Sequence, residues 1–353
     1  SAYLCNWATN GFKSLGLKLS SKIILAPYFK QYSACSAVSA SQWIVRPGQE
    51  SFATFIAVSI EVSVKWLSLI ITQSDNKNHN SFIKSLQEIT KKHEQKLTAV
   101  NTGFVENGKD FGSGYVDVLQ DLKIAVLSGE PTSTLRFGEI WNFFEQQLDY
   151  PISVLDEAYF GRVDLAKYDI LILPDGRGYN SFLSTYNKEK IMDWVKRGGK
   201  LIAMGGALKP FAEKKAFGLK TKEIEKDSSL TVPVFAESQR EQIKKEITGA
   251  IFKTKVDTTH PLAYGYNDSY FTLKLGNAAY SLLENGTVVY LEEKNSIPVA
   301  GFAGSDAQEK VGETLVFGVE NHGRGSVVYM VDNPLFRGFW ENGKLFFANA
   351  IFM

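Results

Sequence analysis

Cysteine and histidine are scarce in this chain, since its 353 residues include two cysteines and four histidines. Cys5 and Cys35 are compatible with one disulfide or with two buried thiols, and their spacing favours neither arrangement. No histidine is followed three residues later by glutamate, so the His-x-x-Glu pair that holds zinc in many hydrolases is absent. The scattered positions lack ligand spacing, and we expect neither a metal nor another cofactor.

An excess of charge of one sign is missing as well. The chain has 39 Lys and Arg residues against 38 Asp and Glu residues, and no block of like charge occurs. Binding to nucleic acid or to an anionic membrane surface depends on concentrated positive charge, so we expect neither. A long apolar run is also lacking, because the most hydrophobic window, residues 52–72, contains Glu61 and Lys65. That window is too polar to span a membrane.

Residues 1–115 are expected to form a small mixed α/β unit. The side chains of residues 56–66 alternate between apolar and polar, which predicts one long, half-exposed strand. Apolar residues spaced by three or four between residues 82 and 89 predict an amphipathic helix. Residues 27–50 have no recognisable pattern. Because the chain begins at Ser1 without methionine, we expect a processed product or a piece of a longer protein.

The second unit, residues 116–353, contains the clearest pattern. Apolar runs without alternation occur at 123–129, 151–156, 168–176 and 200–204, with helical patterns between them. Such runs indicate parallel strands that are buried on both faces. With right-handed crossovers, they predict an α/β fold with a doubly wound, flavodoxin-like parallel sheet.

Helices and further strands complete the prediction for this unit. The first helical pattern is expected to place five apolar residues on one face, namely Leu135, Ile140, Phe143, Phe144 and Leu148. A second helix is predicted at 187–197. A β-rich C-terminal extension follows, with strands at 287–292, 298–302, 314–319 and 325–331 and a closing helix at 343–352.

Several stretches of the chain carry a resemblance to a known family. They are Leu97–Phe104, Lys109–Gly112, Ala125–Glu130, Phe137–Glu145, Tyr168–Gly176, Trp194–Ala203 and Gly325–Pro334, with Phe336–Trp340 and Phe346–Phe352. Together they resemble the class I glutamine amidotransferase fold, in particular the amidotransferase-like region on the C-terminal side of some bacterial zinc carboxypeptidases of the carboxypeptidase A type. The resemblance implies an upstream peptidase domain as partner and a periplasmic or extracellular location.

The catalytic residues of an amidotransferase are missing from the matching positions. That chemistry uses a cysteine on a sharp turn after a strand, usually within Gly-x-Cys-x-Gly. The matching turn here is Gly205–Lys209, and Ala207 stands where the nucleophile belongs. The partner histidine is expected after the last strand of the sheet, where the chain reads Val331–Pro334. We therefore predict a pseudoenzyme, with Ala207 at the apex of a strained turn.

Polar residues nevertheless follow the predicted strands, at the edge where doubly wound sheets bind ligands. The candidates for a ligand pocket are Glu130, Arg136, Asp175, Gly205, Gly206, Asp332, Asn333 and Arg337. A pocket for a small polar ligand, such as a sugar or a peptide, would place Glu130, Asp175, Gly206 and Asn333 around one cleft. The simpler interpretation is that the carboxylates cap helix N-termini and pair with the arginines.

Three functions are compatible with the sequence. The leading hypothesis is a non-catalytic accessory region of a zinc-carboxypeptidase-like protein, which packs on a peptidase domain or aids substrate recognition. The first alternative is a hydrolase that uses the carboxylates at the strand ends. The second is a binding module for a sugar or a peptide.

Overall fold

The computed structural model divides the chain into two units, Ser1–Asp121 and Leu122–Met353. The sequence places this boundary slightly earlier, between residues 115 and 116. The structure describes residues 21–24, 55–62, 65–72, 80–92, 96–100, 104, 110, 117–118, 122–212, 217–222 and 234–353. Residues 27–50 and both cysteines lie outside these ranges.

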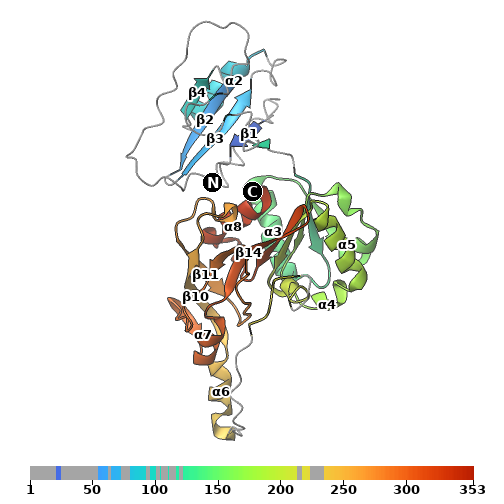
Figure 1. Ribbon diagram of the computed structural model, residues 1–353, viewed down its shortest axis with the longest axis vertical. Coiled ribbons are helices and arrows are strands. Elements are labelled where there is room, and N and C mark those ends of the chain that lie inside the picture. The colour runs from blue at the N-terminus through green and yellow to red at the C-terminus, as the bar shows by residue number, and fades with distance from the viewer. Residues whose placement is uncertain are drawn as a thin grey trace. The chain divides into compact units, whose positions relative to one another are not determined.

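The described part of the first unit is an antiparallel sheet with one helix. The strand order is β4-β2-β3-β1-β5 (Figure 1). The strands are β1 Ser21–Ile24, β2 Phe55–Val62, β3 Lys65–Thr72, β4 Lys96–Val100 and β5 Asp117–Val118. Helix α2, Phe82–Lys92, buries Phe82, Leu86 and Ile89 at the predicted helical spacing.

The single long strand predicted for residues 56–66 is instead part of two strands. β2 and β3 pair with each other in antiparallel register, with Val62 opposite Lys65. Alternation of apolar and polar residues is the same in one strand as in two strands of a hairpin. The alternation therefore could not reveal the reversal of chain direction.

The second unit is built on one mixed sheet, which among the described residues has ten strands. Its parallel part has the order β15-β9-β8-β6-β7, and the antiparallel part continues from β15 as β14-β12-β10-β11, with β13 also paired to β10. The strands of the parallel part are β6 Ile124–Ser128, β7 Ile152–Asp156, β8 Ile170–Leu173, β9 Lys200–Met204 and β15 Gly325–Met330. Those of the antiparallel part are β10 Ile247–Val256, β11 Ser269–Lys274, β12 Thr287–Tyr290, β13 Ala300–Ala303 and β14 Leu315–His322. The predicted α/β class is confirmed, and the β-rich extension belongs to the same sheet.

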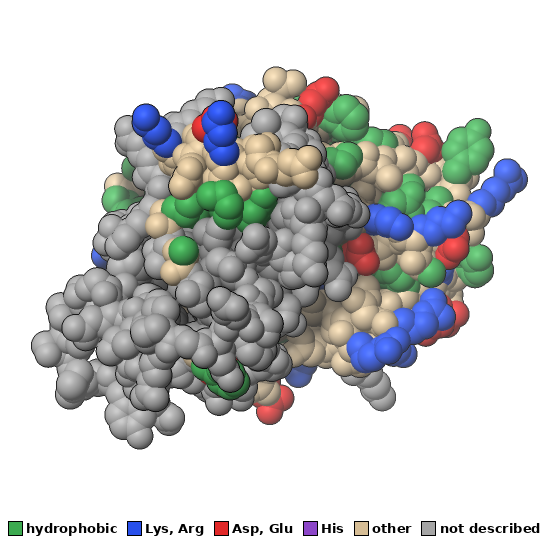
Figure 2. Space-filling model, turned by 90° about the horizontal axis from the view of Figure 1, so that it is seen from above, with side chains coloured by type: hydrophobic (Ala, Val, Ile, Leu, Met, Phe, Trp, Pro, Cys, Tyr) green, Lys and Arg blue, Asp and Glu red, His purple; other side chains and the backbone are tan. Residues whose placement is uncertain are grey.

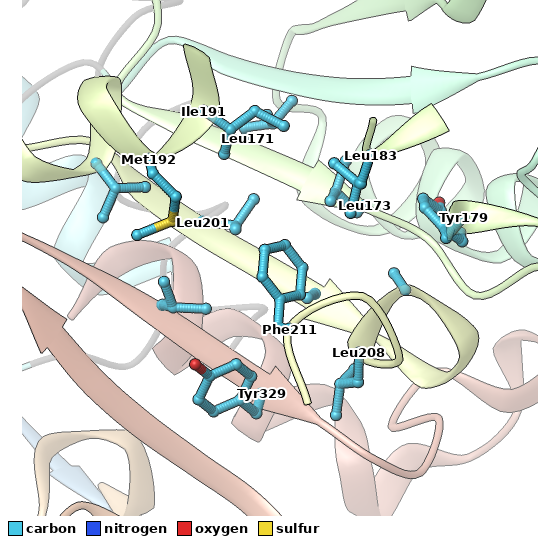
Figure 3. Close-up of a cluster of buried hydrophobic side chains, with 14 of the residues drawn as sticks. Leu171, Leu173, Tyr179, Leu183, Ile191, Met192, Leu201, Leu208, Phe211 and Tyr329 are labelled. Atoms are coloured by element: carbon cyan, nitrogen blue, oxygen red, sulfur yellow. The ribbon is translucent and has the colours of Figure 1, made fainter. Parts of the chain in front are cut away.

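Helices cover both faces of the parallel strands. The longer ones are α3 Thr134–Asn142, continued by the π-helix η2 Phe143–Leu148, and α5 Thr185–Lys196, α6 Ser238–Lys244, α7 Ser305–Val311 and α8 Glu341–Phe352. Shorter helical segments are η3 Glu157–Arg162, η4 Leu165–Lys167, α4 Tyr179–Phe182, η5 Gly205–Leu208, η6 Phe235–Glu237, η7 Pro261–Ala263 and η8 Phe336–Gly338. Ile191 and Met192 of α5 pack with Leu171 and Leu201 in one core (Figure 3). On the opposite face, Phe143 of η2 lies edge-to-face against Phe347 of α8.

Two predictions about these elements are wrong. Leu135 does not face the core with Ile140, because its side chain is 77% exposed. The two residues are five positions apart, which in an α-helix turns Leu135 well away from the face of Ile140. The sequence interpretation also lacks β10 and β11, although buried and exposed residues alternate along both strands. No prediction was made for either segment.

The charges on the surface are mixed, as the balanced composition indicates. On the face drawn in Figure 2, basic, acidic and hydrophobic side chains are interspersed over the described residues. Within the described ranges, no helix is long and apolar enough to cross a membrane.

Candidate functional site at the carboxyl edge of the parallel strands

Three loops meet closely where the parallel strands end. They follow β6, β8 and β9, and glycines allow their backbones to touch. A Cβ atom on Gly176 would lie 2.0 Å from the carbonyl oxygen of Pro131, and one on Gly206 would lie 2.0 Å from the carbonyl oxygen of Gly176. Any side chain at either position would force these loops apart.

Hydrogen bonds fix the loops after β6 and β8 to each other. The Arg177 N–H donates to the Pro131 carbonyl at 2.9 Å, and the Ser133 N–H donates to the Asp175 carbonyl at 3.1 Å. Below them, the Tyr179 hydroxyl donates to the Pro174 carbonyl at 2.6 Å and lies 3.2 Å from the Thr132 hydroxyl. Burial raises the pKa of Tyr179, so its hydroxyl stays protonated and keeps donating.

The turn after β9 has the sharp strand-to-helix shape of a nucleophile elbow, but its strained residue is Gly205. Gly205 has a φ of +51° and directly follows the last residue of the strand. Ala207, which the sequence placed at the apex, is two residues further on, inside η5, and its side chain is fully buried. A side chain at Gly205 would also collide with Asp175, because its Cβ would lie 2.4 Å from Asp175 Oδ1.

The Asp175 carboxylate accepts a hydrogen bond from the backbone N–H group that a catalytic turn would use to bind an oxyanion. In such turns, the N–H of the residue after the nucleophile helps to bind the oxyanion. With Gly205 at the strained position, that residue is Gly206, and its N–H donates to Asp175 Oδ1 at 2.7 Å. A carboxylate in this place would repel an oxyanion. The arrangement is therefore unsuited to acyl transfer.

Glu139 is the centre of the polar cluster, and the sequence interpretation gave it no role. It is 8% exposed, and it accepts hydrogen bonds from Arg136 Nη1 at 2.9 Å, from the Arg337 N–H at 2.7 Å and from Asn333 Nδ2. Arg136 also approaches Asp175, with Nε 3.5 Å from Oδ2. The Arg136-x-x-Glu139 spacing within a helix was the available signal for this pair.

The loop after β15 places a second guanidinium beside this cluster. Arg337 has a left-handed backbone, with a φ of 49°, and its guanidinium carbon lies 5.2 Å from the centre of the Phe336 ring. The guanidinium carbon of Arg136 lies 5.4 Å from the same ring centre. Both cations thus lie within the range of a cation–π contact.

Two candidate residues are outside this cluster. Asp332 is buried and points to β11, where it pairs with Lys274 Nζ at 3.0 Å and accepts from the Thr272 hydroxyl at 2.8 Å. Glu130 is exposed on the loop after β6, next to a cis peptide bond with Pro131. The structure therefore joins Asp175, Gly206 and Asn333 through Arg136 and Glu139, and it places the Glu130 loop beside them.

The histidines of this unit lie elsewhere. His322 is opposite Gly325 in the β14–β15 pairing, at the start of β15 and so at the other edge of the parallel strands. His260 Nδ1 accepts from the Leu262 N–H at 3.0 Å, and burial lowers the pKa of its ring. Among the described residues, no three His, Cys, Asp or Glu side chains lie close enough to share a metal ion.

Comparison with known proteins identifies no family. No family model matches the chain, and no curated protein matches it in sequence. Among solved structures, a glutamine amidotransferase from Thermotoga maritima is 11% identical, with 61% of this chain and 77% of that chain covered and a TM-score of 0.38. A protein from Thermoplasma acidophilum, described as a putative component of GMP synthase, is 10% identical, with 65% and 92% covered and a TM-score of 0.40.

Two further structures have the same kind of likeness. A putative ThuA-like protein from Bacteroides uniformis is 12% identical, with 65% of this chain and 89% of that chain covered and a TM-score of 0.38. A β-galactosidase from Bacillus circulans sp. alkalophilus is 13% identical, and the likeness covers 65% of this chain but only 30% of that one, with a TM-score of 0.36. All four likenesses are distant, with sequence identities of 10 to 13% and TM-scores of 0.36 to 0.40.

Proposed function

We propose that this chain is a non-catalytic, amidotransferase-like accessory region of a zinc-carboxypeptidase-like protein, exported with its peptidase domain. The observation that carries the non-catalytic part is the hydrogen bond from the Gly206 N–H to Asp175. It occupies the donor that would stabilise an oxyanion, at a turn that has no nucleophile. The peptidase partner is inferred from the sequence resemblance.

A hydrolase that uses the strand-end carboxylates fits this geometry less well. A general acid or base needs an oxygen that can reach a substrate proton. Asp332 is buried against Lys274, and Glu139 already accepts from three groups. Asp175 is committed to Gly206 and Arg136. These carboxylates therefore support the loops.

A polar-ligand module remains a second candidate, because of Arg337 and Phe336. The Arg337 guanidinium has no carboxylate partner among the described residues, and it lies against an aromatic ring at the ligand-binding edge of the sheet. A ligand at this edge should contact at least two of Glu130, Asp175, Gly206 and Asn333. A co-crystal structure with a ligand bound elsewhere would remove this candidate.

The accessory-region proposal is tested on the intact protein. We expect the reading frame upstream of Ser1 to encode a His-x-x-Glu pair and a distant histidine, and the purified intact protein to release C-terminal residues from peptides in a zinc-dependent manner. Deletion of residues 1–353 from it should lower the kcat/KM for peptides or the yield of folded peptidase. An upstream frame without a metallopeptidase, or a peptidase unaffected by the deletion, would overturn the proposal.

A further inference from the structure

A hollow at the opposite edge of the parallel strands has a lining of distinct chemistry. It has a volume of about 290 Å³ and lies where helix η2 ends and β7 begins. The described residues around it are Trp141, Phe144, Glu145, Asp149, Tyr150, Pro151 and Ile152. Three of these are aromatic, two are acidic and none is basic. The volume is close to the lower end of the range for small-molecule pockets.

The lining combines two kinds of contact that favour a cation. Aromatic faces attract positive charge through their quadrupole, and tryptophan does so most strongly. The Trp141 side chain is 37% exposed, whereas Phe144 and Tyr150 are buried beneath the surface. Glu145 and Asp149 bring negative charge to the same hollow. An anion would meet two carboxylates there, and a neutral apolar ligand would have to desolvate them.

Trp141 and Glu145 are held in place by each other. The Trp141 indole N–H donates to Glu145 Oε2, across one turn of the helix. This bond fixes the indole and leaves the second carboxylate oxygen without a hydrogen bond among the described residues. A ligand ammonium group could therefore meet the indole face and a carboxylate oxygen together.

The backbone around the hollow also favours a cation. The hollow lies beside the C-terminal end of η2, where helix carbonyls carry partial negative charge. η2 is a π-helix of six residues, a form that is rare and frequent at functional sites. Asp149 follows it with a left-handed φ of 47°. The chain thus keeps an irregular helix end at the position that shapes the hollow.

We propose that this hollow binds a small organic ammonium cation, held by the Trp141 indole and the Glu145 carboxylate. The site is distinct from the carboxyl-edge cluster, since the two lie at opposite ends of the parallel strands. It is also independent of the accessory role proposed above.

The test is isothermal titration calorimetry of the full chain with choline chloride and with its uncharged isostere, 3,3-dimethylbutan-1-ol. We expect choline to bind and the isostere to bind at least about fivefold more weakly, as a cation–π contact of about 1 kcal/mol requires. Trp141→Leu and Glu145→Gln should each weaken choline binding by about fivefold or more. Glu309→Gln, which removes an exposed carboxylate from α7, should leave it unchanged.

Several results would overturn the proposal. Equal binding of choline and its isostere would make the hollow merely apolar. Undetectable binding of choline at about 50 mM, a practical limit well above typical ligand affinities, would mean that no such site exists. Choline binding that neither variant weakens would place the cation elsewhere. Far-ultraviolet circular dichroism of each variant should match that of the unmodified chain, so that loss of binding is not loss of fold.

Discussion

At the scale of single residues, Asp175 holds together the loops at the carboxyl edge of the parallel strands. Its backbone carbonyl accepts from Ser133, and its carboxylate accepts from Gly206 and approaches Arg136. One residue therefore links the loops after β6, β8 and β9 with α3. Gly205 complements it, because a Cβ at that position would overlap the carboxylate. The two residues together close the turn after β9.

Lys200 offers a prediction about pH at this scale. It opens β9, and Nζ donates to the Ile351 carbonyl at 3.3 Å. Burial lowers the pKa of Lys200 from its ordinary value of 10.5 to about 8. The folded state therefore binds fewer protons than the unfolded state between about pH 8 and pH 10.5. In that window, the contribution of Lys200 to stability rises with pH.

We expect Lys200→Met to have a higher free energy of unfolding than the unmodified chain at pH 7, by at most about 3 kcal/mol. This limit is the free-energy equivalent of the lowering of the Lys200 pKa from 10.5 to about 8. The difference should shrink steadily between pH 8 and pH 10. Urea unfolding of both proteins at pH 7, 8, 9 and 10 measures it, and comparing the two proteins cancels the titration of other groups. A difference that is independent of pH would show that Lys200 is not desolvated.

At the scale of elements, helix α8 is held against the segment around η7, which follows strand β10. Asn349 is 4% exposed, and its Nδ2 donates to the carbonyls of Leu262 and Tyr264, at 3.0 and 2.8 Å. One side chain thus holds the segment around η7 against the helix. The Leu262 contact is buried and the Tyr264 contact is partly buried, so water cannot fully replace the lost donor.

We expect Asn349→Leu to lower the free energy of unfolding by about 2 kcal/mol, because one buried and one partly buried carbonyl lose their donor. Asn342→Leu is a matched control on the same helix. Its Nδ2 donates to the Phe271 carbonyl at 2.8 Å, but at an exposed site where water can replace it. Urea unfolding should show a much smaller loss for the control. Equal losses in the two variants would contradict the role of Asn349.

The elements also show what the sequence could and could not predict. β6, β8 and β9 were recognisable because every residue of a strand buried on both faces is apolar, as in Ile170–Leu173. β10 carried an alternation of buried and exposed residues that was not recognised. The pairing of Lys274 with Asp332 could not be predicted, because it depends on where β11 lies relative to β15. Glu139 was missed for a similar reason, since two of its three donors come from a loop almost 200 residues away.

At the scale of the whole molecule, the second unit is a mixed sheet whose parallel strands are covered by helices. The parallel strands still end in tight glycine turns, which is where this fold supports catalysis or ligand binding. Those turns are now joined by a network of side chains that begins at Glu139 and ends at Gly206. This network holds the loops together.

The free energy of unfolding of Glu139→Gln tests that claim most directly. Residues of an active site are often held at a cost to stability, so replacing them leaves a protein equally or more stable. A buried carboxylate that serves as a structural acceptor behaves in the opposite way. Its replacement leaves Arg136 with only the longer contact to Asp175 and places an amide N–H₂ against other donors.

We therefore predict that Glu139→Gln lowers the free energy of unfolding by about 3 kcal/mol, the size of a broken buried ion pair. Glu189→Gln on the exposed side of α5 should change it by less than about 0.5 kcal/mol. Both are measured by urea unfolding at pH 7. A Glu139→Gln variant as stable as the unmodified chain, or more stable, would contradict the claim.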